Sequence, residues 1–442
     1  SSSGSVIQSS GTTSILGTST LLSGTVSLNN LSIGNGKKLV LSQNADLQIT
    51  GLVTLAGNGT IDAVTQSPTT VEFNSPGSQA IPGLIYHHFS INNGGMKTVV
   101  GNITINGDVF IDVNDTLNDG SNNITFKGDI ENTGVYLGTG VANFPLTSTL
   151  SGSGKFNFNN ITVSTRLITN ALTIYVKGSY TNNGILTSSG TFVFNGGNQI
   201  LSGASFNQVL FSGNGTKTLS SDLIFNGNVQ IDSNITVDGS SSNHSIKGNW
   251  NNNGIYTSSA GSTLTFNKNG NQTITSSHFN NLILSGSGIK QATGSLTISG
   301  DITISSSTFD AGSYTHNVAG NWTTNNNAIF SSLGSTIVFN GLDQSIFAAK
   351  FGNVVVSGTG TKSTQRSIQI SGSLNINSNA TLLAGNSVTV DGNLTIDQGG
   401  IFDAGDGGNF NHIMKGDWYN SGTFVPHGST LKFVKNGPVN FM

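Results

Sequence analysis

The sequence predicts an all-β protein, specifically a parallel β-helix (β-solenoid), and three observations support this prediction. Strong helix formers are scarce, since glutamate occurs only at Glu72 and Glu131 and arginine only at Arg166 and Arg366. Short runs that alternate apolar with polar residues fill the chain, with Gly, Asn or Ser between them. These runs recur at a spacing of about 20 residues, which indicates stacked layers rather than a round core.

The composition excludes several classes of protein. Charged residues make up 8% of the 442 residues and the net charge is −3, without clusters, so nothing indicates a nucleic-acid partner. The chain has no cysteine, which excludes disulfides, thiolate metal sites and cysteine catalysis. No run of about 18 apolar residues occurs, so no transmembrane segment is expected.

In chain order, the sequence is predicted to form a single β-solenoid fragment. Residues 1–72 are expected to form N-terminal coils, because VSLNNLSI, LVLSQ, LQITG and VTLAG alternate clearly. Residues 73–193 are expected to contain divergent repeat units. Three closer copies of the repeat unit follow at 194–265, 266–338 and 339–432, the last with one extra coil. Residues 433–442 are expected to start the next coil.

Two independent markers define the larger repeat. An FN strand followed by Gln begins at Phe194, Phe266 and Phe339, which are almost equally spaced. The segments FNQVLFSGNGTK, FNNLILSGSGIK and FGNVVVSGTGTK begin at positions 206, 279 and 351 and have the same spacing. The agreement between the two markers argues against a chance repeat.

A smaller period lies inside the larger one. Glycines that open strands lie about 20 residues apart, in the pairs 227 and 248, 300 and 320, and 372 and 392. The interval from Phe339 to Phe433 exceeds the larger period by the length of one further layer. The predicted unit is therefore a coil of about 20–21 residues with two or three short strands.

These layers predict a right-handed solenoid in which equivalent strands pair along the axis and like side chains stack. About 21 coils spaced ~4.8 Å apart would form an elongated rod roughly 100 Å long. Both ends of such a rod are open, so further coils or capping domains are expected outside this segment. The chain begins at Ser1 without a recognisable signal peptide, and we interpret it as a fragment of a longer secreted product.

Tryptophan recurs at one position of the repeat. Copies of KGNWNNNGIYTSSAGSTLTFN place Trp250, Trp322 and Trp418 at the same point of the motif. Two interpretations are open: exposed platforms for sugars or, as we favour, side chains that cover turns at one corner of the stack.

Histidine recurs in a similar way, at His244, His316 and His412, each four residues before a glycine of the strand-opening register. We interpret these residues as a repeated structural corner. Coils intervene between them, so no shared metal site is expected.

The densest acidic segment, GDVFIDVNDTLNDG, offers a candidate calcium site. Its ligands would be Asp108, Asp112, Asp115, Asn118 and Asp119. Its spacing differs from that of the helical calcium loop, and no glutamate completes the ligand set. DAGDGGNFN, from Asp403, is a weaker candidate, since Asp and Asn also favour turns. No metal, cofactor or catalytic residue is therefore assigned.

A β-helix enzyme that acts on polysaccharides would need clustered carboxylates with a basic residue or calcium. Arg166 and Arg366 have no carboxylate within ten positions in sequence. Asp343, about one coil before Arg366, is the one carboxylate that stacking would bring near it. The chain is therefore predicted not to be an enzyme.

The segments KGNWNNNGIYTSSAGSTLTFN, NQTI, FNNLILSGSGIK and GSLTISGDITIS resemble repeats of very large secreted surface proteins of Bacteroidetes and related bacteria. Those proteins are similar to filamentous-haemagglutinin-type adhesins and commonly carry a C-terminal sorting domain for type IX secretion. The resemblance covers about residues 73–440. It implies an outer-surface adhesin or filament stalk, of the kind used in attachment or gliding motility. Secretion machinery and an outer-membrane anchor would engage regions outside this segment.

The expected function is therefore structural and adhesive. The chain would be a rigid spacer, secreted to the bacterial cell surface, that contacts surface glycans or polysaccharide along its polar faces. A carbohydrate-active β-helix enzyme and a self-assembling surface filament subunit are the alternatives.

Overall fold

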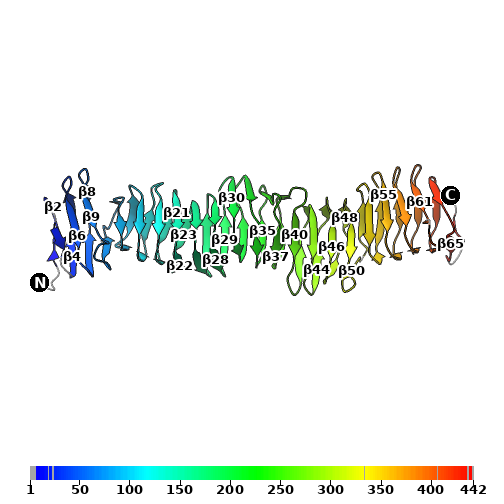
Figure 1. Ribbon diagram of the computed structural model, residues 1–442, viewed down its shortest axis with the longest axis horizontal. Helices are drawn as coiled ribbons and strands as arrows, with labels where there is room; N and C mark the ends of the chain where they lie inside the picture. Colours follow the sequence, from blue (N-terminus) through cyan, green and yellow to red (C-terminus); the bar gives the residue numbers. More distant parts are fainter. Residues whose placement is uncertain are drawn as a thin grey trace. The chain divides into compact units, whose positions relative to one another are not determined.

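The computed structural model describes residues 6–17, 19–21, 24–332, 334–405, 407–435 and 438–440. Within these residues the chain has no helix and forms 65 strands of two to five residues, shown in chain order in Figure 1. The strands are parallel and stack as a β-solenoid of about 21 turns. The predicted fold class is therefore confirmed. Accordingly, no described segment forms a helix long and apolar enough to cross a membrane.

The chain divides into two compact units, Ser1–Lys217 and Thr218–Met442. Both units are built from the same kind of coil.

A coil of the first unit contains three strands, for example β13 (His88–Ile91), β14 (Gly95–Val99) and β15 (Ile103–Ile105). The next coil repeats this order with β16 (Val109–Ile111), β17 (Asp115–Asn118) and β18 (Ile124–Phe126). Each strand pairs in parallel with the strand three places later, so Phe89 lies beside Val109 and Ile103 beside Ile124. The coil therefore has three sides, and each side is a parallel sheet.

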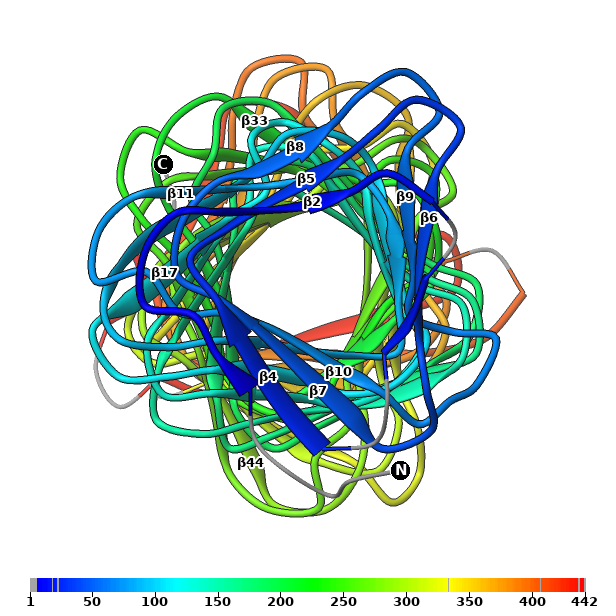
Figure 2. The same cartoon turned by 90° about the vertical axis from the view of Figure 1, so that its left-hand side faces the viewer.

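Figure 2 looks along the first unit and shows these three sides. One side contains β4 (Gly24–Leu28), β7 (Ala45–Ile49) and β10 (Thr70–Phe73). The second contains β2 (Thr12–Ile15), β5 (Asn30–Ile33) and β8 (Val53–Leu55), and the third contains β6 (Lys38–Leu41) and β9 (Thr60–Asp62). The first coils face the viewer, and the chain passes clockwise from β5 to β6 to β7 as it recedes, which is right-handed winding.

The core of the first unit is built from columns of apolar side chains that point inward from successive coils. In most strands buried residues alternate with partly exposed ones, as period-two geometry requires. One column, in which each side chain is at most 9% exposed, consists of Val26, Leu47, Val71, Phe89, Val109, Ile130 and Leu150. Full burial of such a side chain contributes about 1.5–3 kcal/mol.

The length of a coil varies around the predicted value. A short coil separates Phe192 from its partner Val209, whereas a longer one separates Trp250 from its partner Ile274. Backbone pairing sets the strand register, while surface turns accept or lose residues at small cost. The predicted coil length is therefore an average and not a fixed step.

The larger repeat does not contain a whole number of coils. In the second unit, the segment from Phe266 to Phe339 leads from β40 (Thr263–Phe266) to β51 (Thr336–Phe339), eleven strands later. Because a coil has three strands, eleven strands make three and two-thirds coils, and each copy of the repeat starts on a different side. The interval before Phe433 is longer: β65 (Thr430–Phe433) lies fourteen strands after β51, which adds one complete coil.

Strand-opening glycines of the second unit stack closely on one another. A Cβ atom on Gly320 would lie 2.2 Å from the carbonyl carbon of Gly300, and one on Gly248 would lie 2.1 Å from that of Gly227. The obstacle is backbone, which cannot move aside as a flexible side chain could. The recurrence of glycine at this register therefore follows from close coil-to-coil contact.

We predict that Gly320→Ala lowers the free energy of unfolding by about 1–3 kcal/mol, because the methyl group would push two paired coils apart. Urea unfolding of the full chain, followed by circular dichroism, measures this effect. Gly77→Ala is the matched control, since a Cβ at Gly77 meets nothing within 4 Å. Equal midpoints for the two variants would contradict the stacking explanation.

Candidate functional site

A repeated pair of buried polar side chains, one glutamine and one lysine, lies inside the solenoid. The glutamine precedes the lysine by one coil, and their strands pair in register. The pairs are Gln79 with Lys97, Gln272 with Lys290, and Gln344 with Lys362. All six side chains are buried. Buried groups with perturbed titration are candidates for chemistry, so their contacts decide their role.

The glutamine of each pair joins two coils through backbone groups. Gln272 Nε2 donates hydrogen bonds to the carbonyl oxygens of Ile246 at 3.0 Å and Gly248 at 2.6 Å, one coil earlier. Its Oε1 accepts a hydrogen bond from the N–H of Lys268 at 3.0 Å. The amide therefore supplies a donor to Gly248 and a second donor to Ile246, whose carbonyl oxygen also accepts the N–H of Asn267.

The lysine of each pair closes a glycine-rich turn. Lys290 Nζ donates to the carbonyl oxygens of Lys268 at 2.8 Å, Gly270 at 3.0 Å and Ser287 at 2.9 Å. Burial lowers the pKa of Lys290, and likewise that of Lys217, to about 8. All three ammonium protons of Lys290 are donated to these carbonyl oxygens, so none is free to take part in catalysis. The role of this lysine is therefore structural.

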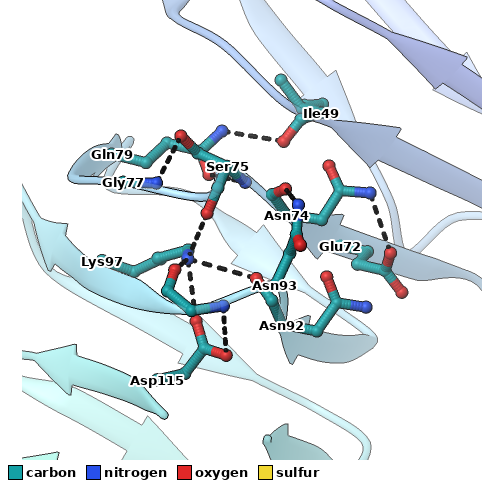
Figure 3. A network of polar contacts seen from close by, with 11 residues as sticks. Ile49, Glu72, Asn74, Ser75, Gly77, Gln79, Asn92, Asn93, Lys97 and Asp115 are labelled. Carbon is teal, nitrogen blue, oxygen red and sulfur yellow. Dashed lines mark hydrogen bonds and ion pairs between the residues drawn. The ribbon is translucent and has the colours of Figure 1, made fainter.

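Lys97 differs from the other copies because a carboxylate completes its environment (Figure 3). Its Nζ donates to carbonyl oxygens of the turn, including that of Ser75 at 2.7 Å, and lies 2.8 Å from Asp115 Oδ1. Both side chains are fully buried. Asp115 Oδ2 also accepts the N–H of Gly94 at 3.0 Å. The pair is a closed ion pair, so breaking it by removing one partner would leave an uncompensated charge.

The acidic segment around Asp115 does not form the candidate calcium site. The carboxylate of Asp119 is buried and accepts hydrogen bonds from the N–H groups of Ser121, Thr139 and Gly140. The side chains of the other three candidate calcium ligands either have different hydrogen-bond partners or are exposed. Asp108 Oδ1 accepts the N–H of Asp129, Asn118 Oδ1 accepts the N–H of Gly120, and Asp112 is exposed between β16 and β17. Across the described residues, no group of three or more His, Cys, Asp or Glu side chains could hold a metal ion.

The second acidic segment is only partly described. Asp403 Oδ1 accepts the N–H of Gly405 at 2.9 Å and lies 3.0 Å from His427 Nε2. Asp406, the other carboxylate of this segment, lies outside the described residues. Asp403 is thus used in a turn and in a contact with the His427 ring.

The three repeated histidines have the predicted structural role but do not share a corner, because they lie on three different sides, in β37 (His244–Ile246), β48 (Thr315–Val318) and β62 (Asn411–Met414). Each is buried, and each has both ring nitrogens hydrogen-bonded to backbone. In His316, Nδ1 accepts the N–H of Leu296 at 3.1 Å, and Nε2 lies 2.9 Å from the carbonyl oxygen of Ala311. This arrangement requires the neutral ring with its proton on Nε2. Burial lowers the pKa of His244, His316 and His412 below the ordinary histidine value.

The three tryptophans are neither exposed platforms nor residues of one corner. Their exposed fractions are 2% for Trp250, 0% for Trp322 and 8% for Trp418, so their rings belong to the core. They lie on three different sides, in β38 (Trp250–Asn252), β49 (Trp322–Thr324) and β63 (Trp418–Asn420). Burial excludes exposed platforms for sugars. A single corner is excluded because the tryptophans are eleven and fourteen strands apart, and neither interval is a multiple of three. Both interpretations from the sequence are therefore wrong.

Arg366 and Asp343 do not form an acidic and basic pair. The Arg366 guanidinium lies 3.4 Å from the ring centre of Phe347, and Asp343 Oδ1 accepts the N–H of Thr361. No ion pair joins the two side chains, both of which are described.

A surface groove of the first unit is the candidate functional site. It has a volume of about 610 Å³ and follows the third side of the coil, across β9, β12 (Ile85–Tyr86), β15, β18 and β21 (Val141–Phe144). Its floor is a column of outward side chains in register: Ile85, Thr104, Thr125 and Asn143.

The groove offers hydrogen-bonding groups but no pair of carboxylates among its described lining residues. Threonine hydroxyls and asparagine amides line it, with the half-exposed Ile85 as an apolar contact. The carboxylate that does line it, Asp62, lies 3.4 Å from Lys38 Nζ. Glycoside hydrolysis generally needs two carboxyl groups on either side of the bond, and these residues do not supply them. The groove therefore presents threonine and asparagine side chains to a polar ligand.

The sequence did not identify this groove or the glutamine and lysine pairs. In the sequence, Gln and Lys only mark the repeat, and nothing in their positions indicates burial. Thr104 and Thr125, at the same place in ITI and ITF one coil apart, are the signal that could have indicated an outward column.

We predict that Gln272→Leu destabilises the chain by about 1–3 kcal/mol, because the buried carbonyl group of Gly248 loses the amide donor of Gln272. The midpoint of urea unfolding measures the loss. Gln291→Leu, the same change at an exposed glutamine of the neighbouring coil, is the matched control. If both variants unfold at the same urea concentration, the amide does not join the coils.

We predict that stability falls as the pH is lowered from about 7.5 to about 5. The folded state holds the three buried histidines neutral with a lowered pKa, while the unfolded chain takes up protons near pH 6.5. Their contribution is thus complete above about pH 6.5 and is lost as the pH falls through the folded pKa. Replacing His244, His316 and His412 with Gln should flatten this dependence, whereas His278→Gln, at an exposed position, should not.

Comparisons of this chain with protein-family models, with curated proteins and with solved structures give no match.

Proposed function

We propose that this chain is a structural and adhesive stalk segment of a large secreted bacterial cell-surface protein. It would act as a spacer and contact surface glycans through polar grooves on its sides. The observation that carries the proposal is the contrast between interior and surface in the first unit. Inside, Lys97, Asp115 and Asp119 are engaged by their hydrogen-bonding partners; outside, a long groove presents ordered hydroxyl and amide groups.

The architecture of each unit supports the spacer role. A column of about ten coils, spaced ~4.8 Å apart, spans roughly 50 Å with every side paired along the axis. Stiffness then comes from backbone hydrogen bonds, which salt does not screen. The resemblance of the repeats to Bacteroidetes surface proteins supports a secreted location, type IX export and a role in attachment or gliding.

The proposal predicts that beads coated with the full chain are retained on surfaces bearing neutral polysaccharide. Thr104→Val with Thr125→Val should weaken retention about threefold to tenfold, because two hydroxyl groups on the groove floor are lost while their shape is kept. Thr303→Val with Thr323→Val is the matched control, since these residues also stack outward on paired coils, in the second unit.

Two outcomes would contradict the proposal. Retention no higher than on an uncoated surface, across a panel of neutral and acidic polysaccharides, would exclude the adhesive role. Release of new reducing ends from any of them, abolished by changing one aspartate, would favour the enzyme alternative.

A further inference from the structure

The second unit carries two smaller grooves at equivalent positions of the repeat. One, of about 310 Å³, is lined by residues that include Ile255, Tyr256 and His278. The other, of about 290 Å³, is lined by residues that include the repeat counterparts of these three, Ile329, Phe330 and Lys350. The groove is therefore a property of the repeat.

The same local structure builds both grooves. An asparagine-rich turn follows the buried tryptophan and ends in an exposed isoleucine, 58% exposed at Ile255 and 61% at Ile329. The aromatic residue that follows each isoleucine is buried against the tryptophan ring, at 5.1 Å for Tyr256 and 4.8 Å for Phe330 between ring centres. The aromatic pair therefore fixes the turn that forms one wall.

The two grooves face different sides of the second unit. The first lies across β39 (Ile255–Thr257), β42 (Ser277–Phe279) and β45 (Leu296–Ile298). The second lies across β50 (Ile329–Ser331) and β53 (Lys350–Phe351). The change of side follows from the eleven strands between equivalent positions.

The groove at Lys350 has a charge that its counterpart lacks. Lys350 and Arg366 both line it, and none of its described lining residues is a carboxylate. Neither cation forms an ion pair or a side-chain hydrogen bond anywhere in the described part of the chain. The Arg366 guanidinium is held over the Phe347 ring at 3.4 Å, which restricts its movement and leaves its N–H groups available.

We propose that this groove binds the anionic group of an acidic polysaccharide, a carboxylate or a sulfate on a sugar ring. The inference rests on the proposed glycan-binding function and names the substrate class for this site. A guanidinium can donate two parallel hydrogen bonds to such a group, and Lys350 adds a second charge. The exposed Asn326 can bind ring hydroxyls, and Ile329 provides an apolar contact.

Nucleic acid and membrane surfaces fit the groove less well. Binding to these polyanions relies on many phosphate contacts spread over a basic surface. Here two cations line a small groove in a chain with a net charge of −3. A groove with two cations next to asparagine amides matches a sparsely charged sugar polymer.

Titration calorimetry of the full chain with polygalacturonate and with its methyl ester tests the proposal, since esterification removes the charge and keeps the sugar backbone. We expect polygalacturonate to bind at least about tenfold more tightly, and added salt to reduce this difference. Replacing Lys350 and Arg366 with Gln should abolish the preference. Replacing Lys155 and Arg166, exposed cations of the first unit, with Gln removes equal charge and should leave it unchanged.

Circular dichroism and the urea midpoint establish that each variant is folded. Three results would overturn the inference: equal affinity for acid and ester, an unchanged preference in the Lys350 and Arg366 variant, or tighter binding of polyphosphate than of polygalacturonate. If neutral polysaccharide is still retained while the acid gives no preference, the inference alone fails. If no polysaccharide binds at all, the proposed function fails as well.

Discussion

Parallel backbone pairing between each strand and the strand three places later is the interaction on which the structure depends. It fixes the register of inward side chains, so columns such as Val71, Phe89 and Val109 stack directly on one another. It leaves the turns free to vary, which is why coils as short as the one before Val209 and as long as the one before Ile274 occur in one chain. Charge has little part in this arrangement, in keeping with a charged fraction of 8%.

Pairing along three sides leaves carbonyl groups at the turns without strand partners, and buried side chains satisfy many of them. Gln272, Lys290 and His316 each bond to backbone groups of their own turn or of the preceding coil. An unsatisfied buried polar group costs about 1–3 kcal/mol, so these residues are needed for stability. Their perturbed pKa values, where burial shifts them, therefore reflect structure rather than catalysis.

A repeat of three and two-thirds coils has a consequence for binding. Any surface feature that belongs to the repeat appears on a new side of the second unit in the next copy, as the two grooves near Ile255 and Ile329 do. Grooves on several sides could engage a polymer or a surface in several orientations, and linked weak contacts give high avidity. Variation within the repeat, such as His278 against Lys350, would then change specificity without changing the fold.

The sequence by itself determined the fold class, the average coil length and the structural role of the histidines. These features follow from local periodicity, because the alternation of apolar and polar residues in a strand depends only on residues close together in the sequence. The sides on which residues lie were decided only by the tertiary structure, because the number of strands per coil is not visible in the spacing of the larger repeat. The three tryptophans were for this reason placed wrongly. The groove at Thr104 and Thr125 and the cations at Lys350 and Arg366 likewise emerge only when coils are stacked, since their members are about one coil apart in sequence.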